Sequence, residues 1–288
     1  MSDKPDNSLE AGAAGALAPG YTLADYRIER ILAVSPRDVV YLAADTGRGY
    51  SVVIKEYLPD LAARAESQPP TDGRDDNFER GLERFLVTAR KLLRVNHPGI
   101  VRARRIIEAN NTAYLVMDHE EGETLEALLG VPERFSEARL RALSLSLLDG
   151  LEAMHAASLY HGAIKPGAIL IRPDGSTVLL DYDAAPHAAE RAGQILSNGA
   201  LPGYAPIELY TRMEQRGPWS DLYSLAAVLY RVVTGRRPLD ATDRLLEDRM
   251  IPAETVAQGR YNADFLRAID AALGVRAEQR PQNLAKWR

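Results

Sequence analysis

The sequence predicts an α+β fold in which a strand-rich lobe precedes a mostly helical lobe. Between residues 26 and 118, short segments rich in β-branched and aromatic residues are interrupted by one amphipathic helix. Beyond Gly122 the apolar residues recur mainly at helical spacing. Because strands and helices are segregated along the chain, a doubly wound sheet with alternating helices is not expected.

The composition is that of an ordinary globular protein. Of 288 residues, 46 % are hydrophobic and 26 % are charged, which excludes a wholly disordered or membrane-embedded chain. The net charge of −5 argues against bulk attraction to nucleic acid or to an anionic membrane. Cysteine is absent, so disulfides and cysteine metal sites are excluded and a cytoplasmic location is expected. The best uncharged apolar run, Leu222–Tyr230, is too short for a membrane span, which needs roughly 18 residues.

Three segments are expected along the chain. Residues 1–20 are small, polar and rich in Pro and Gly, which predicts a disordered tail. Residues 21–120 are expected to form the first lobe and residues 121–288 the second, with the seam near Asp118–Gly122. The polar stretch Pro59–Asn77 reads as a long exposed loop.

Five strands and one main helix are predicted in the first lobe. Apolar residues at three- and four-residue spacing predict the helix at Phe78–Val95. The strands are expected at Tyr26–Val34, Val39–Ala44, Tyr50–Tyr57, Val101–Glu108 and Thr112–Asp118, the last two forming a hairpin across Ala109–Asn111.

The second lobe is expected to contain two long helices and a short hairpin. Ser136 and Ser220 are the expected N-caps of the helices, and Gly235 closes the second one. Ile169–Arg172 and Val178–Asp181 are the expected strands of the hairpin, on either side of a Pro-Asp-Gly turn.

Short motifs also occur along the chain in a fixed order. They are Val53-Ile54-Lys55, His97-Pro98-Gly99-Ile100-Val101, His161-Gly162-Ala163-Ile164-Lys165-Pro166-Gly167-Ala168, Asp181-Tyr182-Asp183, Pro206-Ile207-Glu208 and Arg280-Pro281. With them, the chain from about Tyr26 to Arg288 resembles bacterial Ser/Thr protein kinase domains, whose V-A-I-K, H-P-x-I-V, H-R-D-L-K-P-x-N, D-F-G, A-P-E and R-P motifs follow this order. The resemblance implies the bilobal kinase fold, with a five-stranded N-lobe and a mostly helical C-lobe.

The resemblance also implies a set of nucleotide-binding residues. These are Val40, Lys55, Met117, Asp118, Glu120, Lys165 and Asp181, with Asp181 as a possible ligand of one Mg²⁺. For Lys55 an equally weighted alternative is a packing lysine whose amine reaches solvent. The family's phosphate-covering glycines are replaced by Ala33, Ser35 and Asp38, so this turn is not expected to grip a triphosphate.

Four positions of the family's chemical machinery carry other residue types. By the resemblance, Ala163 replaces the catalytic aspartate, Ala168 the metal-binding asparagine, Gly162 an arginine and Thr88 the glutamate that pairs with the lysine. Loss of a general base alone typically costs 10²- to 10⁴-fold in rate.

The positions that hold the fold are retained. In the family, the counterpart of Glu208 pairs with that of Arg280, that of Asp221 binds the catalytic-loop backbone, and that of His161 packs. Retained structural residues beside altered chemical ones predict a pseudokinase, not an enzyme, that serves as a protein-binding scaffold or regulatory signalling module.

Two alternatives remain open at this point. The first is a nucleotide-binding switch that holds ATP weakly through Lys55 and Asp181, and the second, less favoured, is an atypical Ser/Thr kinase or other transferase. ATP and Mg²⁺ are expected to bind weakly or to be unnecessary. The expected partner is another protein, with no nucleic acid and no direct membrane insertion, and the chain could belong to a longer protein tethered to a membrane.

Overall fold

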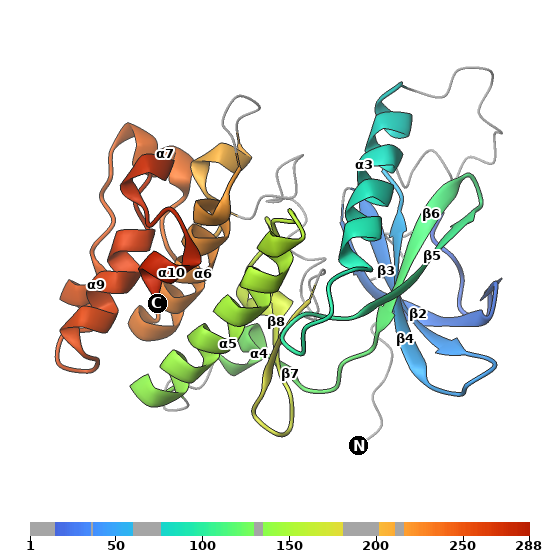
Figure 1. Ribbon diagram of the computed structural model, residues 1–288, viewed down its shortest axis with the longest axis horizontal. Helices are drawn as coiled ribbons and strands as arrows, with labels where there is room; N and C mark the ends of the chain where they lie inside the picture. Colours follow the sequence, from blue (N-terminus) through green and yellow to red (C-terminus); the bar gives the residue numbers. More distant parts are fainter. Residues whose placement is uncertain (1–14, 36, 60–75, 130–134, 181–201, 211–215) are drawn as a thin grey trace. The chain divides into compact units, whose positions relative to one another are not determined.

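A computed structural model describes residues 15–35, 37–59, 76–129, 135–180, 202–210 and 216–288 (Figure 1). The chain forms two compact units. The first contains the described residues up to Val95 and Arg102–His119, and the second contains Asn96–Val101 and the described residues from Glu120 to Arg288. Strands dominate the first unit and helices the second, as the sequence predicts.

A six-stranded antiparallel sheet and one long helix make up the first unit. The helix is α3 (Asp76–Leu92), which packs against the last two strands. In sheet order the strands are β1 (Thr22–Leu23), β2 (Tyr26–Val34), β3 (Asp38–Asp45), β4 (Ser51–Tyr57), β6 (Thr112–Asp118) and β5 (Ala103–Ala109). One strand more than predicted is present, because two residues before the first predicted strand pair with it. The predicted β5–β6 hairpin is confirmed, with Asn110 and Asn111 both in the left-handed region at φ 52° and 58°.

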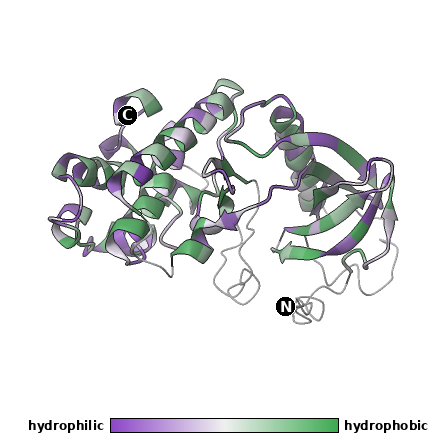
Figure 2. Cartoon of the chain, turned by 90° about the horizontal axis from the view of Figure 1, so that it is seen from below, coloured by the Kyte–Doolittle hydropathy of each residue, from purple (hydrophilic) through white to green (hydrophobic). Residues whose placement is uncertain are grey.

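The two faces of this sheet bury different sets of side chains, because successive residues of a strand point to opposite faces. Figure 2 shows the resulting alternation of hydrophobic and hydrophilic residues along the strands. One face carries a closed apolar cluster that includes Tyr41, Ile54 and Val116. The next residues along two of these strands, Lys55 and Met117, belong to the opposite face.

The chain before β1 covers part of the apolar cluster. Leu17 is 6 % exposed, and its amide donates to the Tyr41 hydroxyl at 3.1 Å. Of the predicted disordered tail, residues 1–14 lie outside the described part of the chain, whereas residues 15–20 pack on the sheet through Leu17. An apolar side chain and two hydrogen bonds to the sheet, the second from the Gly20 amide to the Ile28 carbonyl at 2.8 Å, hold this short segment, and its polar composition does not reveal these contacts.

A buried carboxylate lies inside this cluster. Glu56 is fully buried, and its two oxygens accept hydrogen bonds from the hydroxyls of Tyr41 at 2.5 Å and Tyr114 at 2.7 Å. Burial, followed by the nearby Glu56 carboxylate, raises the pKa of Tyr41, so the phenol stays protonated as a donor. The network joins β3, β4 and β6 through side chains, in addition to the backbone ladder.

The second unit is built on two long helices. These are α5 (Glu137–Ala156), capped by Ser136 as predicted, and α6 (Pro218–Thr234), which is buried along most of its length. The shorter helices are α4 (Leu125–Leu128), α7 (Ala241–Leu246), α8 (Ala253–Val256), α9 (Ala263–Ala272) and α10 (Leu284–Trp287). A small sheet in the order β7 (Glu123–Thr124), β8 (Ile169–Ile171) and β9 (Thr177–Leu179) contains the predicted short hairpin.

The predicted start of α6 is wrong by three residues. The helix begins at Pro218 after Gly217, not after Ser220. The Ser220 hydroxyl instead accepts from the Gly217 amide at 3.3 Å and donates to Glu208 at 2.7 Å, so tertiary contacts use the side chain that resembled a cap. Gly235 ends the helix in the left-handed conformation, as predicted.

We predict that Tyr41→Phe lowers the free energy of unfolding by about 1.5–3 kcal/mol, because it removes a buried hydrogen bond to a carboxylate. Urea unfolding of the whole chain measures this change. Tyr50→Phe is the matched control, since Tyr50 is 38 % exposed and should change stability by less than about 0.5 kcal/mol. Equal losses in the two variants would contradict a stabilising role for the Glu56 network.

Candidate functional site

The loop that follows α5 is held by one buried carboxylate. Asp221, near the start of α6, is fully buried and accepts hydrogen bonds from the amides of His161 at 3.0 Å and Gly162 at 2.8 Å. His155 of α5 places its Nε2 atom 2.8 Å from the same carboxylate. Asp221 therefore joins the loop to α5 and α6, and it fixes the backbone immediately before Ala163.

The same loop is tied to the segment that leads to Asp181. The ring of His161 places Nε2 2.9 Å from the Leu180 carbonyl, and the Leu180 amide donates to the Ala168 carbonyl at 2.8 Å. Asp181 itself lies outside the described residues. These two hydrogen bonds fix Leu180, the residue immediately before the expected metal ligand Asp181, against the loop.

Gly162 occupies a backbone conformation that favours glycine. Its φ is +67°, in the left-handed region, and a Cβ at this position would meet no atom within 4 Å. A side chain would fit in the space but would strain the backbone. The glycine therefore suits the loop geometry, which adds a structural reason to its departure from the family's arginine.

The two alanines of the loop differ in their surroundings. Ala163 is exposed, whereas Ala168 is 1 % exposed at the end of the short 3₁₀ turn Pro166–Ala168. Neither side chain carries a polar atom. Lys165 is half-buried immediately before this turn and is the cation of the loop.

In the first unit, the strand register brings three of the expected nucleotide-binding residues to one sheet face. Lys55 on β4 lies opposite Val40 on β3 and opposite Leu115 on β6. Met117 lies on the same face two residues along β6, and Val40 and Met117 are almost fully buried. This face therefore combines a half-buried lysine with an apolar floor.

The turn between β2 and β3 uses its own amides. The Ser35 hydroxyl accepts hydrogen bonds from the amides of Arg37 at 3.1 Å and Asp38 at 3.0 Å. Backbone amides are the groups by which a glycine-rich turn cradles phosphates. These two are already satisfied by a side chain, and Pro36 lies outside the described residues.

Thr88 lies on the exposed side of α3, next to the buried Ala89. Because Thr88 is exposed, it does not hold α3 in place. The helix is positioned on β5 and β6 by its apolar side.

Two further expected site residues are held by arginines that the motifs do not reveal. Arg172 donates to both oxygens of Glu120, with Nε–Oε2 at 2.7 Å and Nη2–Oε1 at 2.9 Å. Within the first unit, Arg104 binds both oxygens of Asp118 in the same way. These hydrogen bonds raise the pKa of each guanidinium. Both carboxylates thus have structural partners, and no local sequence signal points to such long-range pairs.

The second unit also contains a buried ion pair. Arg280 Nη1 lies 2.8 Å from Glu208 Oε1, and both side chains are fully buried. The guanidinium also donates to the carbonyls of Gly274 and Val275, each at 2.7 Å, and lies over the ring of Tyr223. Every charged atom of the pair is compensated, which is the condition under which a buried pair is tolerated.

Among the described residues, no group of three or more His, Cys, Asp or Glu side chains could hold a metal ion. In the same part of the chain, no helix has both the length and the apolarity that a membrane crossing requires.

Comparisons with known proteins identify relatives of the chain. The protein kinase domain family matches residues 39–271. Serine/threonine-protein kinase PknA of Mycobacterium tuberculosis is 32 % identical over 76 % of this chain and 49 % of its own length. Serine/threonine-protein kinase pkn2 of Myxococcus xanthus is 32 % identical over 78 % of this chain and 26 % of its own length. The chain therefore spans half or less of these curated relatives.

Solved structures give the same result for the fold. The structure titled PpkA-294 apo form matches with a TM-score of 0.73 and 30 % sequence identity. The match covers 95 % of this chain and 98 % of the chain in that structure. A mutant form of the Mycobacterium tuberculosis PknI kinase domain, at 21 % identity and a TM-score of 0.67, supports the fold alone. The predicted kinase-like α+β fold is confirmed.

The same comparisons contradict the prediction of a pseudokinase that is no enzyme and acts as a scaffold. Relatives at about a third identity are named serine/threonine-protein kinases. The physical reason for the error is that phosphoryl transfer depends mainly on positioning and charge stabilisation. The lack of a carboxylate at Ala163 and of an amide at Ala168 therefore lowers the expected rate but does not by itself abolish the reaction.

We predict that Arg280→Ala destabilises the chain by about 3–5 kcal/mol, because it leaves the Glu208 carboxylate buried without its cation. Arg288→Ala is the matched control, since Arg288 pairs at the surface with Asp149 and should cost no more than about 1 kcal/mol. Chemical unfolding compares the two. A loss below 1 kcal/mol for Arg280→Ala would show that the pair does not anchor this unit.

Proposed function

Because the chain belongs to the protein kinase family, we propose that it transfers a phosphoryl group from ATP to a serine or threonine hydroxyl of a protein. The observation that carries this proposal is the match over residues 39–271, together with relatives named serine/threonine-protein kinases. The fixed loop around Ala163, bound to Asp221 through two backbone amides, supports it.

The chemistry is compatible with an alanine at position 163. In most phosphoryl transfers the bond to the leaving group is largely broken before the new bond forms, so the catalyst mainly aligns the reactants and stabilises charge. A general base then contributes a factor of about 10²–10⁴, not the whole rate enhancement. We therefore infer a slow kinase, in which the attacking hydroxyl loses its proton to solvent or to the phosphoryl oxygens.

The residues present fit a nucleotide better at its base than at its phosphates. The apolar face with Val40 and Met117 suits an adenine ring, and Lys55 on the same face supplies positive charge for phosphates. The Ser35 turn has two of its amides committed, so we infer weak ATP binding. Mg²⁺ would neutralise phosphate charge, and Asp181 is the carboxylate that the family motif assigns to it.

The proposed partner is a protein substrate, and the proposed location is the cytoplasm, where ATP is available. A cysteine-free chain is suited to that compartment. Because the chain covers half or less of its curated relatives, further segments could tether such a domain to a membrane.

We predict slow transfer of ³²P from γ-labelled ATP to myelin basic protein or casein in the presence of Mg²⁺ or Mn²⁺. Lys55→Ala should lower this transfer at least tenfold, because it removes a cation from the phosphates. Arg30→Ala, an exposed arginine on β2 of the same sheet, should leave the rate unchanged. Equal incorporation by wild type and Lys55→Ala would overturn the proposal.

We predict that Ala163→Asp raises the rate of transfer by about 10²–10⁴-fold, because it places a general base on a loop that is already fixed. Ala163 is exposed, so the carboxylate fits without repacking. Ala163→Asn is the control of equal size that cannot accept the proton. The mechanism fails if Asp and Asn at this position give the same single-turnover rate.

A further inference from the structure

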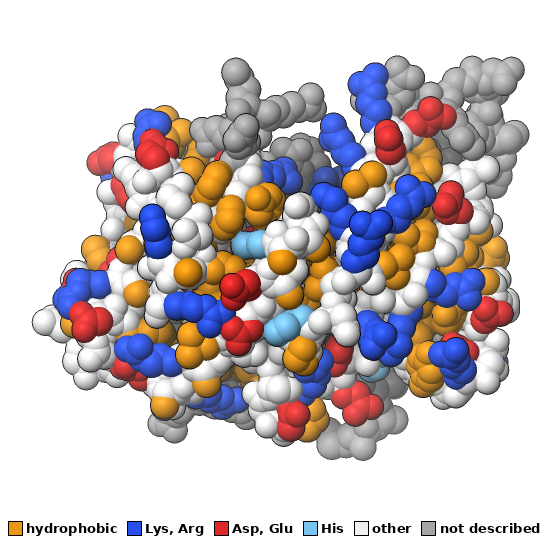
Figure 3. Space-filling view, viewed as in Figure 1, with side chains coloured by type: hydrophobic (Ala, Val, Ile, Leu, Met, Phe, Trp, Pro, Cys, Tyr) orange, Lys and Arg blue, Asp and Glu red, His pale blue; other side chains and the backbone are white. Residues whose placement is uncertain are grey.

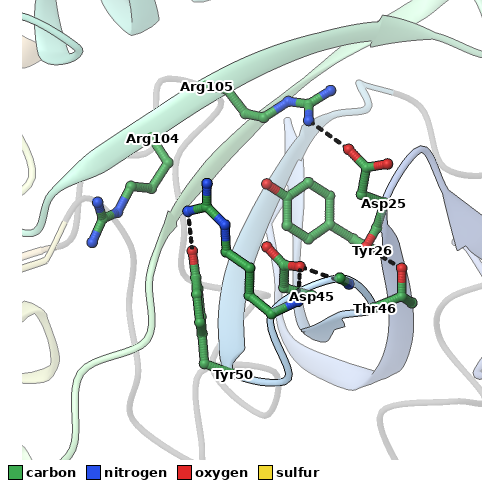
Figure 4. A pocket seen from close by; sticks show the side chains of 9 residues that line it. Asp25, Tyr26, Asp45, Thr46, Tyr50, Arg104 and Arg105 are labelled. Atoms are coloured by element: carbon green, nitrogen blue, oxygen red, sulfur yellow. Dashed lines mark hydrogen bonds and ion pairs between the residues drawn. The ribbon is translucent and has the colours of Figure 1, made fainter.

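A pocket lies within the first unit. Its volume is about 600 Å³, and it is formed by the β1–β2 turn, the β3–β4 turn and the start of β5. Lys55, Val40 and Met117 do not line it. Figure 4 shows Arg105 reaching Asp25 beside the ring of Tyr26, whereas the Arg104 side chain extends away from Tyr26 and Asp45.

An irregularity in β5 brings two consecutive arginines to this pocket. The register of β5 against β6 shifts between Ala103 and Arg105, so that two steps along β5 match a single step along β6. In a regular strand, neighbouring side chains point to opposite faces, whereas a β-bulge redirects one of them. Arg104 and Arg105 are consequently both exposed and both line the pocket.

Of these two arginines, Arg105 has the more readily exchanged partner. Arg105 Nη1 lies 2.9 Å from Asp25 Oδ2, in a pair whose side chains are 43 % and 69 % exposed. Arg104 binds Asp118, with side chains 39 % and 24 % exposed. An exposed ion pair with a single contact contributes little to stability, so a stronger anion can displace Asp25 from Arg105, whereas the bidentate Arg104–Asp118 pair is held more firmly. Arg105 also lies over the ring of Tyr26, 5.6 Å from its centroid, which orients the guanidinium.

The third arginine of the pocket comes from the β3–β4 turn. Asp45 is 7 % exposed, and its Oδ1 accepts the amides of Gly47 at 3.0 Å and Arg48 at 2.9 Å, which fixes the turn. The Arg48 guanidinium donates to the Tyr50 hydroxyl at 3.4 Å, a long and weak contact. Arg48 is thus held at the pocket by its backbone while most of its donors face solvent.

The surroundings of the pocket are rich in positive charge, although the chain as a whole carries −5. The stretch from residue 90 to residue 105 contains no acidic residue and six basic ones, namely Arg90, Lys91, Arg94, Arg102, Arg104 and Arg105. Figure 3 shows Lys and Arg side chains gathered over α3 and the neighbouring strands of this unit. Such a local field attracts anions.

We propose that this pocket binds a phosphoryl dianion, carried by a phosphorylated serine or threonine side chain of a protein. Arg48 from the β3–β4 turn and Arg105 from β5 both line the pocket, and arginine binds phosphoryl oxygens in a bidentate manner. A carboxylate ligand would gain nothing over Asp25, whereas a phosphoryl group carries a charge of about −2 and three oxygens. Free phosphate shares this chemistry, and the experiment separates the two sources. The proposal is independent of the proposed transfer reaction, because it requires binding alone.

The test is a titration of the whole chain, without nucleotide, with a fluorescent Gly-Gly-phosphoserine-Gly-Gly peptide, its unphosphorylated form and inorganic phosphate. The phosphopeptide should bind, the unphosphorylated peptide should not, and free phosphate should compete more weakly. Arg48→Gln and Arg105→Gln should each weaken phosphopeptide binding about ten- to a hundredfold, since each removes charge-assisted hydrogen bonds. Arg30→Gln removes the same charge from β2, outside the pocket, and should weaken binding less than threefold.

Asp25→Asn keeps the proposal falsifiable even where an arginine variant folds poorly. It removes the carboxylate that competes for Arg105, so phosphopeptide binding should tighten several-fold, which a folding defect cannot produce. Phosphate binding as tightly as the phosphopeptide would support the anion site and assign it to the free ion. The proposal is overturned if wild type does not distinguish the two peptides, or if Arg30→Gln weakens binding as much as Arg48→Gln.

Discussion

The carboxylate of Asp221 is the constraint on which the second unit depends. It is fully buried at the start of α6, and it bonds two loop amides and the ring of His155. A buried charge is stable only where donors surround it, so the loop, α5 and α6 must take up one relative arrangement. This constraint fixes the backbone at Ala163 whatever side chain that position carries.

A second buried charge performs the same task further along the chain. Glu208 receives Arg280 and the Ser220 hydroxyl, which links the short turn at Ile207–Leu209 to α6 and to the last part of the chain. Ser220 and Asp221 are neighbours, so the two networks meet at the first turn of α6. Among the described residues, two buried networks position this loop, while Ala163 and Ala168 carry no polar side-chain atom. The proposed slow kinase is consistent with both observations and with the relatives of the chain.

The error in the functional prediction has a specific source. The motifs at residues 161–168 and 53–55 correctly indicate the family, but the residue types at these positions do not by themselves decide whether activity is present. A missing base changes an activation barrier by a finite amount, whereas alignment by a fixed loop is visible only in the structure. Gly162 illustrates the same point, because its φ of +67° gives the glycine a backbone role that the motif comparison read only as a lost arginine.

The sequence by itself determined the order of elements, most of their boundaries and the family, because hydrophobic periodicity and motif order are local properties of the chain. It also indicated the start of α5 at Ser136 and the end of α6 at Gly235, because a cap depends only on one residue and its neighbours in the chain. Only the tertiary structure decided the roles of Ser220, Glu56, Glu120 and Asp118, whose partners lie 12 to 58 residues away in the chain. The arginine pocket belongs to the same class, since a bulge in β5 and a distant turn create it together. Contacts across such separations follow from how strands and helices pack, and a single sequence carries no periodic signal for them.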